Sequence, residues 1–261
     1  MAPRAQVETD WNAEADLALA PDRLPYAAQP ETDWTAYAQT YDMLLEHNPA
    51  YQDLLVEFEN ALSKVETPRV IYDVGGGTGN YSQVALGRYP DSALYFIEPD
   101  TGMRLRAAEK LSAHGKVTFI DRPLQEVEAP ARADLVICAH ALYTMPQPAD
   151  RLVELRNLLR PGGVLFLVDL GRLMNVSEWR TYLLSHMMRK LGVIEATKLF
   201  WKGREIAAQN KAIFRAQKAN LYWTHSDTEI AAAVEQAGFE IMAQKTVYRG
   251  YSDLLLCRAA A

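Results

Sequence analysis

The chain has 261 residues, of which 49% are hydrophobic and 23% charged, proportions typical of a globular protein with a sizeable core. Its 27 lysines and arginines against 33 aspartates and glutamates give a net charge of −6, which argues against a nucleic-acid-binding protein. No apolar run approaches the roughly 20 residues of a membrane span, and the first residues lack the apolar segment of a secretory signal. We therefore expect a cytoplasmic protein without membrane association, with Cys138 and Cys257 as buried reduced thiols.

The N-terminal region predicts a tail followed by two helices. Residues 1–32 are rich in alanine, proline and acidic residues without a sustained hydrophobic period, so we expect a mobile tail with one short helix around Trp11–Leu19. Asp33 is a suitable N-cap for a helix that begins at the next residue. Pro49 opens a second helix, Ala50–Val65, because apolar residues recur there at helical spacing.

From Arg69 onward, short apolar runs alternate with helical segments. Strands that alternate with helices predict a parallel sheet with right-handed crossovers. The expected strands are Val70–Val74, Ala93–Glu98, Val117–Ile120, Leu135–Ala139 and Gly163–Asp169, and the segments between them are Tyr81–Arg88, Gly102–His114, Leu124–Glu128 and Pro148–Leu159.

Residues 171–224 break this alternation and predict two or three helices. Residues 171–220 hold ten lysines and arginines and three acidic residues, a local charge of +7 that leaves −13 for the rest of the chain. The basic block is open to three interpretations: a solvated face, a site that attracts an anionic substrate, or an RNA contact.

The C-terminal residues predict a helix and a closing hairpin. Ser226 is a suitable N-cap for a helix over Asp227–Ala237, and Gly238 is suited to end it. Glu240–Tyr248 and Asp253–Arg258 then alternate as two strands joined by a short turn.

The first strand runs into a glycine-rich turn, Asp73-Val-Gly75-Gly-Gly77-Thr-Gly79, that opens the next helix. Glycines let the backbone approach a ligand closely, and the start of the helix offers free N–H groups. A dinucleotide-binding loop would place its third glycine at Asn80, which argues against NAD. A nicotinamide dehydrogenase nevertheless stays open as an alternative, because an acidic residue also ends the next strand.

This turn resembles the first motif of the class I S-adenosylmethionine-dependent methyltransferases, and four further motifs follow in order. They are Glu98 at the end of the next strand, 21 residues after Gly77; Asp121 after the third strand; Asp134-Leu-Val-Ile-Cys-Ala139; and Leu159-Arg-Pro-Gly-Gly163. The resemblance implies an α/β fold with a Rossmann-like seven-stranded sheet, parallel except for an antiparallel C-terminal strand. Helices would cover both faces, and a helical insertion would follow strand 5.

The resemblance also implies a cofactor, S-adenosyl-L-methionine, with S-adenosyl-L-homocysteine as its product. Ordinary packing is the alternative to a cofactor contact for Met103 and for the pair Tyr37 and Tyr41 in the first expected helix. By position, Gly75 and Gly77 would line the methionine part, Asp73 would face its ammonium group, and Glu98 would bind the ribose. Pro99, Met103, Asp121 and Arg122 would surround the adenine, Ala139 would lie at the catalytic rim, and Tyr37 and Tyr41 would cover the site.

His140 is the candidate catalytic base because it directly follows the fourth strand, where ligands of parallel sheets gather. The alternative is a structural histidine. Tyr143 is a candidate for orienting the acceptor, and Trp179, Tyr182 and His186 on the insertion are candidates for substrate contacts. No metal ligand set is expected. The remaining histidines, among them His225, look like surface or capping residues.

We therefore expect a methyltransferase that acts on an O, N, S or C nucleophile of a small organic metabolite, as a monomer or homodimer. The alternatives are a tRNA-modifying methyltransferase and a cofactor-binding relative that does not methylate. The expected division is a tail (1–32), helices that cover the cofactor (33–66), a Rossmann-like core (67–170 and 225–261) and a substrate-binding lid (171–224).

Overall fold

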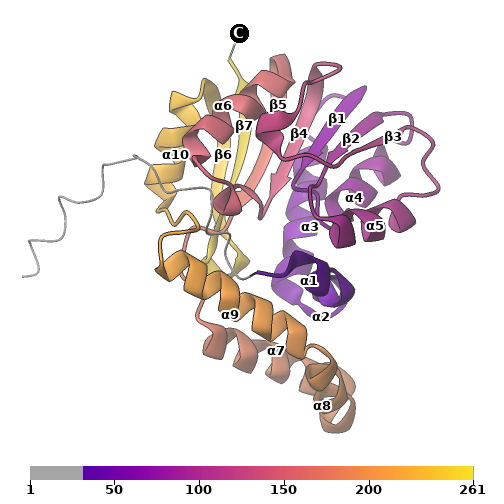
Figure 1. Cartoon of the computed structure of the whole chain (residues 1–261), viewed down its shortest axis with the longest axis vertical. Helices are drawn as coiled ribbons and strands as arrows, with labels where there is room; N and C mark the ends of the chain where they lie inside the picture. The colour runs from indigo at the N-terminus through magenta and orange to yellow at the C-terminus, as the bar shows by residue number, and fades with distance from the viewer. Residues whose placement is uncertain (1–31, 261) are drawn as a thin grey trace, which may run out of the picture.

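A computed structural model gives the structure of the chain and describes residues 32–260. The expected mobile tail and its short helix therefore lie outside the described residues, except for Thr32. A seven-stranded sheet in the order β3-β2-β1-β4-β5-β7-β6 forms the centre of the molecule (Figure 1). Its strands are β1 (Val70–Val74), β2 (Ala93–Ile97), β3 (Val117–Ile120), β4 (Ala133–Ala139), β5 (Leu159–Asp169), β6 (Phe239–Val247) and β7 (Ser252–Ala259).

The sheet is parallel except for one strand. β7 runs antiparallel to both of its neighbours, β5 and β6, whereas β1 to β5 pair in parallel. This arrangement confirms the predicted fold class. Cys138 and Cys257 are buried and unpaired, as expected, and β5 separates them.

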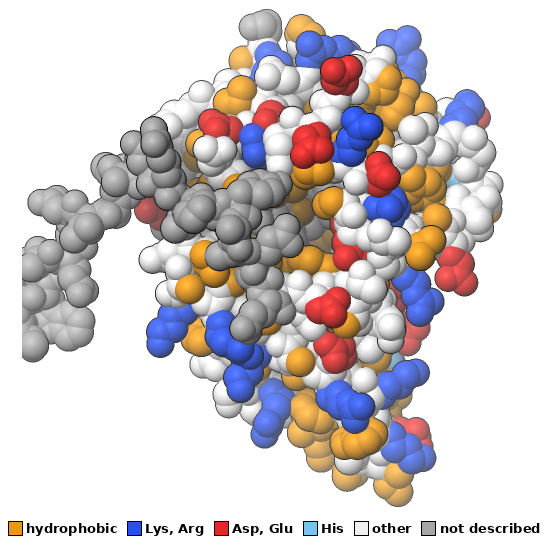
Figure 2. Space-filling view, viewed as in Figure 1, with side chains coloured by type: hydrophobic (Ala, Val, Ile, Leu, Met, Phe, Trp, Pro, Cys, Tyr) orange, Lys and Arg blue, Asp and Glu red, His pale blue; other side chains and the backbone are white. Residues whose placement is uncertain are grey.

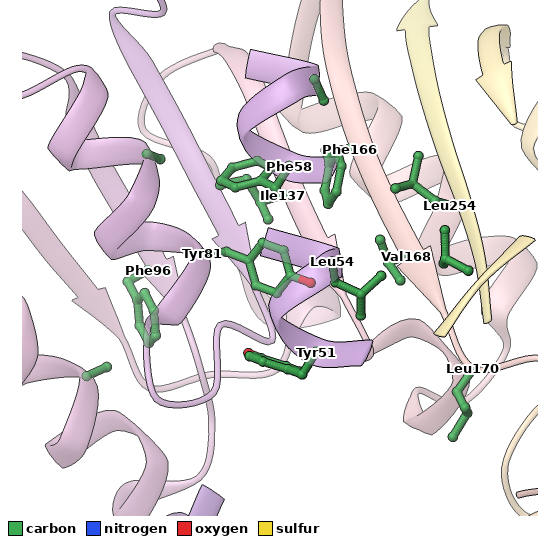
Figure 3. Close-up of a cluster of buried hydrophobic side chains, with 14 of the residues drawn as sticks. Tyr51, Leu54, Phe58, Tyr81, Phe96, Ile137, Phe166, Val168, Leu170 and Leu254 are labelled. Carbon is green, nitrogen blue, oxygen red and sulfur yellow. The ribbon is translucent and has the colours of Figure 1, made fainter. Parts of the chain in front are cut away.

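Helices cover both faces of the sheet, and others lie beyond its edge. The helices of the described residues are α1 (Trp34–Tyr41), α2 (Met43–His47), α3 (Pro49–Leu62), α4 (Asn80–Arg88), α5 (Thr101–Lys110), α6 (Pro148–Leu158), α7 (Val176–Leu191), α8 (Val193–Lys202), α9 (Arg204–Lys218) and α10 (Asp227–Gln236), with single 3-10 turns η1 (Leu124–Glu126), η2 (Leu142–Thr144) and η3 (Tyr248–Gly250). Apolar side chains of α3, α4 and α5 pack on one face of the sheet, and those of α6 and α10 pack on the other. Figure 3 shows the first of these clusters, where the rings of Phe58 and Phe166 lie 4.7 Å apart, between α3 and the sheet.

The expected helix starts are confirmed by their caps. Asp33 accepts the N–H of Ala36 at 2.8 Å, and Ser226 forms a full capping box with Glu229. The helix expected over Ala50–Val65 ends earlier, at Leu62, because the last residues change to shorter i→i+3 hydrogen bonds. Helix α2 was not predicted, and the segment expected over Leu124–Glu128 is only the 3-10 turn η1.

The insertion consists of α7, α8 and α9, at the upper limit of the two or three helices expected. These helices lie beyond the edge of the sheet, and α8 is at the end of the molecule farthest from the sheet (Figure 1). Helix α9 contacts α1 as well as α7. The insertion and the N-terminal helices therefore meet over the edge where β1, β2 and β4 end.

Candidate active site

The glycine-rich turn between β1 and α4 lies against the end of β2. The N–H groups of Gly75 and Gly76 donate to the carbonyl of Ile97, at 2.8 and 3.3 Å. A Cβ on Gly76 would lie 2.3 Å from the ring of Phe96, so there is no room for a side chain. Gly77 has a φ of +57°, and a Cβ added to it would meet no atom within 4 Å. The turn is therefore closed towards the sheet and open at Gly77, where a ligand can approach the backbone.

Glu98 directly follows β2, and its carboxylate lies beside this opening. Its Oε2 accepts the N–H of Gly77 and its Oε1 accepts the N–H of Asp100, both at 2.9 Å. The residue is only 8% exposed, and burial raises the pKa of the carboxyl to about 7. A carboxylate oxygen can accept more than one hydrogen bond, so the group remains available to hydroxyl donors of a ligand.

Asp73 in β1 is a second buried carboxylate beside the turn. The hydroxyl of Ser82 in α4 donates to its Oδ2 at 2.6 Å, and burial raises its pKa to about 7. Within residues 32–260, the Asp73 and Glu98 carboxylates accept hydrogen bonds from hydroxyl and backbone N–H groups and pair with no lysine or arginine. Two buried acids without a cation of their own favour a positively charged ligand.

Polar contacts hold the N-terminal helices across the turn. Asp42, which follows α1, accepts a hydrogen bond from the Thr78 hydroxyl at 2.7 Å and pairs with the Lys110 ammonium of α5 at 2.9 Å. The Thr35 hydroxyl of α1 donates to the Asp100 carboxylate at 2.9 Å. These contacts tie α1 to both the glycine turn and the start of α5.

A group of tyrosine rings covers the site from these helices. Tyr37 and Tyr41 in α1 are in edge contact, with ring centroids 5.1 Å apart, and Tyr51 of α3 and Tyr81 of α4 continue the group. The Tyr37 hydroxyl donates to Oδ1 of Asn210 in α9 at 3.2 Å. Burial raises the pKa of each of these four phenols well above its ordinary value, so they stay neutral hydrogen-bond donors.

The residues expected around the adenine lie at the same edge in different environments. Asp121 and Arg122 directly follow β3, and both are exposed, as is Pro99 after β2. Met103 in α5 is 2% exposed and belongs to the apolar core. Ala139 ends β4 and is partly buried. A flat ligand group therefore has an open approach beside β3, whereas Met103 already has the packing role that the sequence left open.

His140 follows β4 in a left-handed conformation, with a φ of +52°. Its Nε2 lies 2.9 Å from the Ser252 hydroxyl of β7, and its ring packs edge-on against Tyr248, with centroids 4.9 Å apart. Burial lowers the pKa of the imidazole to about 4, although part of the residue reaches the surface. His140 is therefore neutral at physiological pH and directed towards β7.

Tyr143 is held by a buried polar group that no sequence motif predicts. Its N–H donates to Oδ1 of Asp169 at 3.0 Å, and Oδ2 of Asp169 lies 3.2 Å from Nε2 of His225. The expectation that His225 is a surface or capping residue is wrong, because its side chain is fully buried beside this carboxylate. Gly171 makes room for it, since a Cβ there would lie 2.5 Å from the imidazole ring.

The three substrate candidates of the insertion all lie on α7. Trp179 is 4% exposed, and its ring lies 4.7 Å from that of Tyr248. The Arg249 guanidinium lies 4.0 Å from the ring centroid of Tyr182, which joins α7 to the turn between β6 and β7. His186 is partly exposed, and its pKa is lowered by desolvation and by neighbouring basic side chains. The structure therefore brings Trp179 and Tyr182 to the hairpin turn and leaves His186 outside that contact.

Part of the chain is similar in sequence to known methyltransferases. A family model described as "Methyltransferase domain" matches residues 72–165, from β1 into β5. An uncharacterized methyltransferase of Geobacillus kaustophilus is 32% identical over 139 residues, which cover 51% of this chain and 63% of the relative. A malonyl-[acyl-carrier protein] O-methyltransferase of Halalkalibacterium halodurans is 29% identical over 110 residues, 41% of each protein.

A solved structure extends the likeness in fold to most of the chain. The N-methyltransferase NodS of Bradyrhizobium japonicum WM9, in complex with S-adenosyl-L-homocysteine, aligns with a TM-score of 0.59 at 13% identity. The alignment covers 88% of this chain and all of NodS. Residues 72–165 therefore match a methyltransferase domain, and the chain has the fold of the class I S-adenosylmethionine-dependent methyltransferases. Its sequence matches span less than two thirds of the two relatives named above.

The sequence motifs indicate the glycine turn and Glu98 but not the groups that surround them. Tyr51, Tyr81 and Tyr248 were not singled out, because they come from separate elements and meet only in the folded chain. Within residues 32–260, no group of three or more His, Cys, Asp or Glu side chains is arranged to hold a metal ion. No helix in that part of the chain is long and apolar enough to cross a membrane.

Proposed function

We propose that the chain is an S-adenosylmethionine-dependent methyltransferase that methylates an O, N, S or C nucleophile of a small organic metabolite. The observation that carries the proposal is the buried Glu98 carboxylate, 2.9 Å from the N–H of Gly77, where the turn leaves open space. When bound there, S-adenosylmethionine supplies a methyl group on a positively charged sulfur. The family match over residues 72–165 supports the same assignment.

The residues around the turn fit the groups of this cofactor. Glu98 would accept hydrogen bonds from the two ribose hydroxyls, and its charge would repel a 2′-phosphate. The backbone of Gly75 and Gly77 would line the methionine part, and Asp73 would lie towards its ammonium group. Both carboxylates are buried and pair with no lysine or arginine of residues 32–260, so a cationic ligand would compensate the cost of ionising them.

The remaining cofactor contacts are proposed because the residues concerned lie at the same edge of the sheet as the glycine turn. The adenine would lie beside the exposed residues that follow β3, and the tyrosines of α1 would cover the site. In this proposal Pro99, Met103, Asp121 and Arg122 surround the adenine, Ala139 lies at the rim beside the methyl group, and Tyr37 and Tyr41 form the cover.

The acceptor side suits a nucleophile that loses its proton easily. With a pKa of about 4, the His140 imidazole is a weak base, which suits an acceptor that gives up its proton easily, such as a carboxylic acid or an acidic phenol. Tyr143 would orient that acceptor, and Trp179, Tyr182 and His186 would line its site on the insertion. The relative from Halalkalibacterium halodurans is named for O-methylation, which agrees with this proposal.

Isothermal titration with S-adenosylmethionine and with NAD tests the cofactor, and transfer of labelled methyl groups to a panel of small carboxylic acids and phenols tests the reaction. Binding of NAD without binding of S-adenosylmethionine would refute the proposal. Cofactor binding without transfer to any acceptor would favour a non-methylating relative, and transfer to tRNA would favour the tRNA-modifying alternative. His140→Ala should lower turnover while cofactor affinity stays the same.

A further inference from the structure

The tip of the insertion carries the two most exposed large apolar side chains among residues 32–260. Ile194 is 73% exposed and Trp201 is 71% exposed, and Val193 beside them is 61% exposed. Ile194, Thr197, Lys198 and Trp201 follow one another at helical spacing, so they share one face of α8. They line a shallow hollow at the surface. The opposite face holds the buried Ala196 and packs on α7 and α9, so the exposed face has no partner within the described chain.

Basic side chains surround this apolar face. Arg189 and Lys190 end α7, Lys198 and Lys202 lie on α8, and Arg204 begins α9; all five are exposed. Two acidic residues, Glu195 and Glu205, leave a local charge of +3 over residues 188–205. The Arg204 guanidinium lies 4.6 Å from the ring centroid of Trp201, so cation and indole form one surface. Figure 2 shows hydrophobic and basic side chains together at this lower end of the molecule.

We propose that this tip, residues 188–205, binds to the surface of an anionic phospholipid bilayer. An exposed indole beside aliphatic side chains fits the boundary between headgroups and acyl chains, and the lysines and arginines around it match the phosphates. The tip lies at the end of the molecule farthest from the sheet (Figure 1). It can therefore insert into the headgroup region of a bilayer without any movement of the core. This mode of binding needs no membrane span, but it departs from the expectation, made from the sequence, of a protein without membrane association. It does not depend on the proposed reaction.

Two other occupants fit the surface less well. A symmetric pair of copies would bring the same patch of both chains together, and five basic side chains of one copy would then face the same five of the other. A nucleic acid would meet the basic residues and could stack one base on Trp201, but the exposed aliphatic side chains Val193 and Ile194 offer its other bases neither hydrogen bonds nor an aromatic surface. The combined apolar and basic character therefore favours lipid.

Co-sedimentation of the full chain with vesicles tests the proposal. We expect binding to vesicles with roughly 30% phosphatidylglycerol, and binding about tenfold weaker to pure phosphatidylcholine or in about 0.5 M salt. The double variant Ile194→Ser/Trp201→Ser and the charge variant Lys198→Glu/Lys202→Glu should each lose about tenfold in vesicle affinity. Leu105→Ser on α5 is the matched control, because Leu105 is 66% exposed but distant from the tip in the chain; it should bind like the parent.

The variants are at exposed positions, so their circular dichroism spectra and unfolding midpoints should match those of the parent chain. Equal binding to neutral and anionic vesicles, unchanged binding of either tip variant, or the same loss in the Leu105→Ser control would overturn the proposal. A dimer in sedimentation equilibrium that the Ile194→Ser/Trp201→Ser variant dissociates would also overturn it, because the tip would then be an interface between copies.

Discussion

The cofactor half of the candidate site depends on backbone geometry, whereas the insertion half depends on side-chain packing. In the cofactor half, the glycine turn and Glu98 are joined through main-chain N–H groups, and the turn is tied to the end of β2. In the insertion half, Trp179 and Tyr182 are placed by contacts of their rings with Tyr248 and Arg249.

This difference has consequences for how each half tolerates change. A glycine turn allows few substitutions. An added Cβ meets a buried neighbour, or the substituted residue must adopt an unfavourable positive φ. A packed helix face accepts many apolar side chains of suitable size. The sequence motifs accordingly lie in the cofactor half, and the insertion carries none of them.

The largest effect is expected from Gly75→Ala. The new Cβ would lie 2.4 Å from that of Ala141, at a φ of +65°, so we expect a loss of about 3 kcal/mol in the free energy of unfolding. Urea denaturation of the unliganded protein measures it. Gly87→Ala is the matched control, because a Cβ there meets no atom within 4 Å in helix α4, and it should gain about 0.5–1 kcal/mol. Equal stability of both variants would show that packing does not require glycine in the turn.

The next effect is expected from Glu98→Gln. The amide keeps the size of the side chain but loses the charge that strengthens hydrogen bonds to ribose hydroxyls. We expect a loss of about 1.5–3 kcal/mol in the free energy of S-adenosylmethionine binding, measured by isothermal titration. Glu109→Gln, at a side chain 77% exposed on the far end of α5, is the control and should bind normally. An unchanged affinity in Glu98→Gln would mean that the ribose does not lie beside Gly77.

A smaller and graded effect is expected from pH. Burial raises the pKa of Asp73 and Glu98 to about 7, so the folded chain binds their protons more tightly than the unfolded chain does. The unliganded protein should therefore lose stability as pH rises from about 4 to about 7. A cationic ligand binds the ionised carboxylates, so its affinity should rise over the same range and level off above it.

Thermal unfolding and isothermal titration at several pH values measure the two trends. Glu98→Gln is again the informative variant, because it removes one of the two titrating carboxyls and should flatten the pH dependence of binding. A cofactor affinity that does not change between about pH 5.5 and 8 would contradict ionisation of these groups on binding.

The cofactor half could be predicted from the sequence because its signals are local. The bounds of β1 and β3 are those expected, since each is a short apolar run between turn residues. The glycine turn and Glu98 are also adjacent to strand ends in the chain, so topology alone brings them to one edge of the sheet.

The surroundings of that site could not be predicted in the same way. His225 precedes the capping residue Ser226, and this local context favoured a surface position. Only the fold places its ring between Asp169 at the end of β5 and Asp253 of β7. Tyr248 likewise meets His140 and Trp179 from three separate segments. Such contacts depend on how distant elements pack, which no short motif encodes.

The smallest effect is expected at the contact between the two halves. The Tyr37 hydroxyl of α1 donates to Asn210 of α9 at 3.2 Å, so Tyr37→Phe should cost about 1 kcal/mol of stability. Asn210→Ala should cost a similar amount. If the two side chains stabilise each other, the double variant will lose less than the sum of the single losses in urea denaturation. Strictly additive losses would mean that this hydrogen bond does not couple α1 to α9.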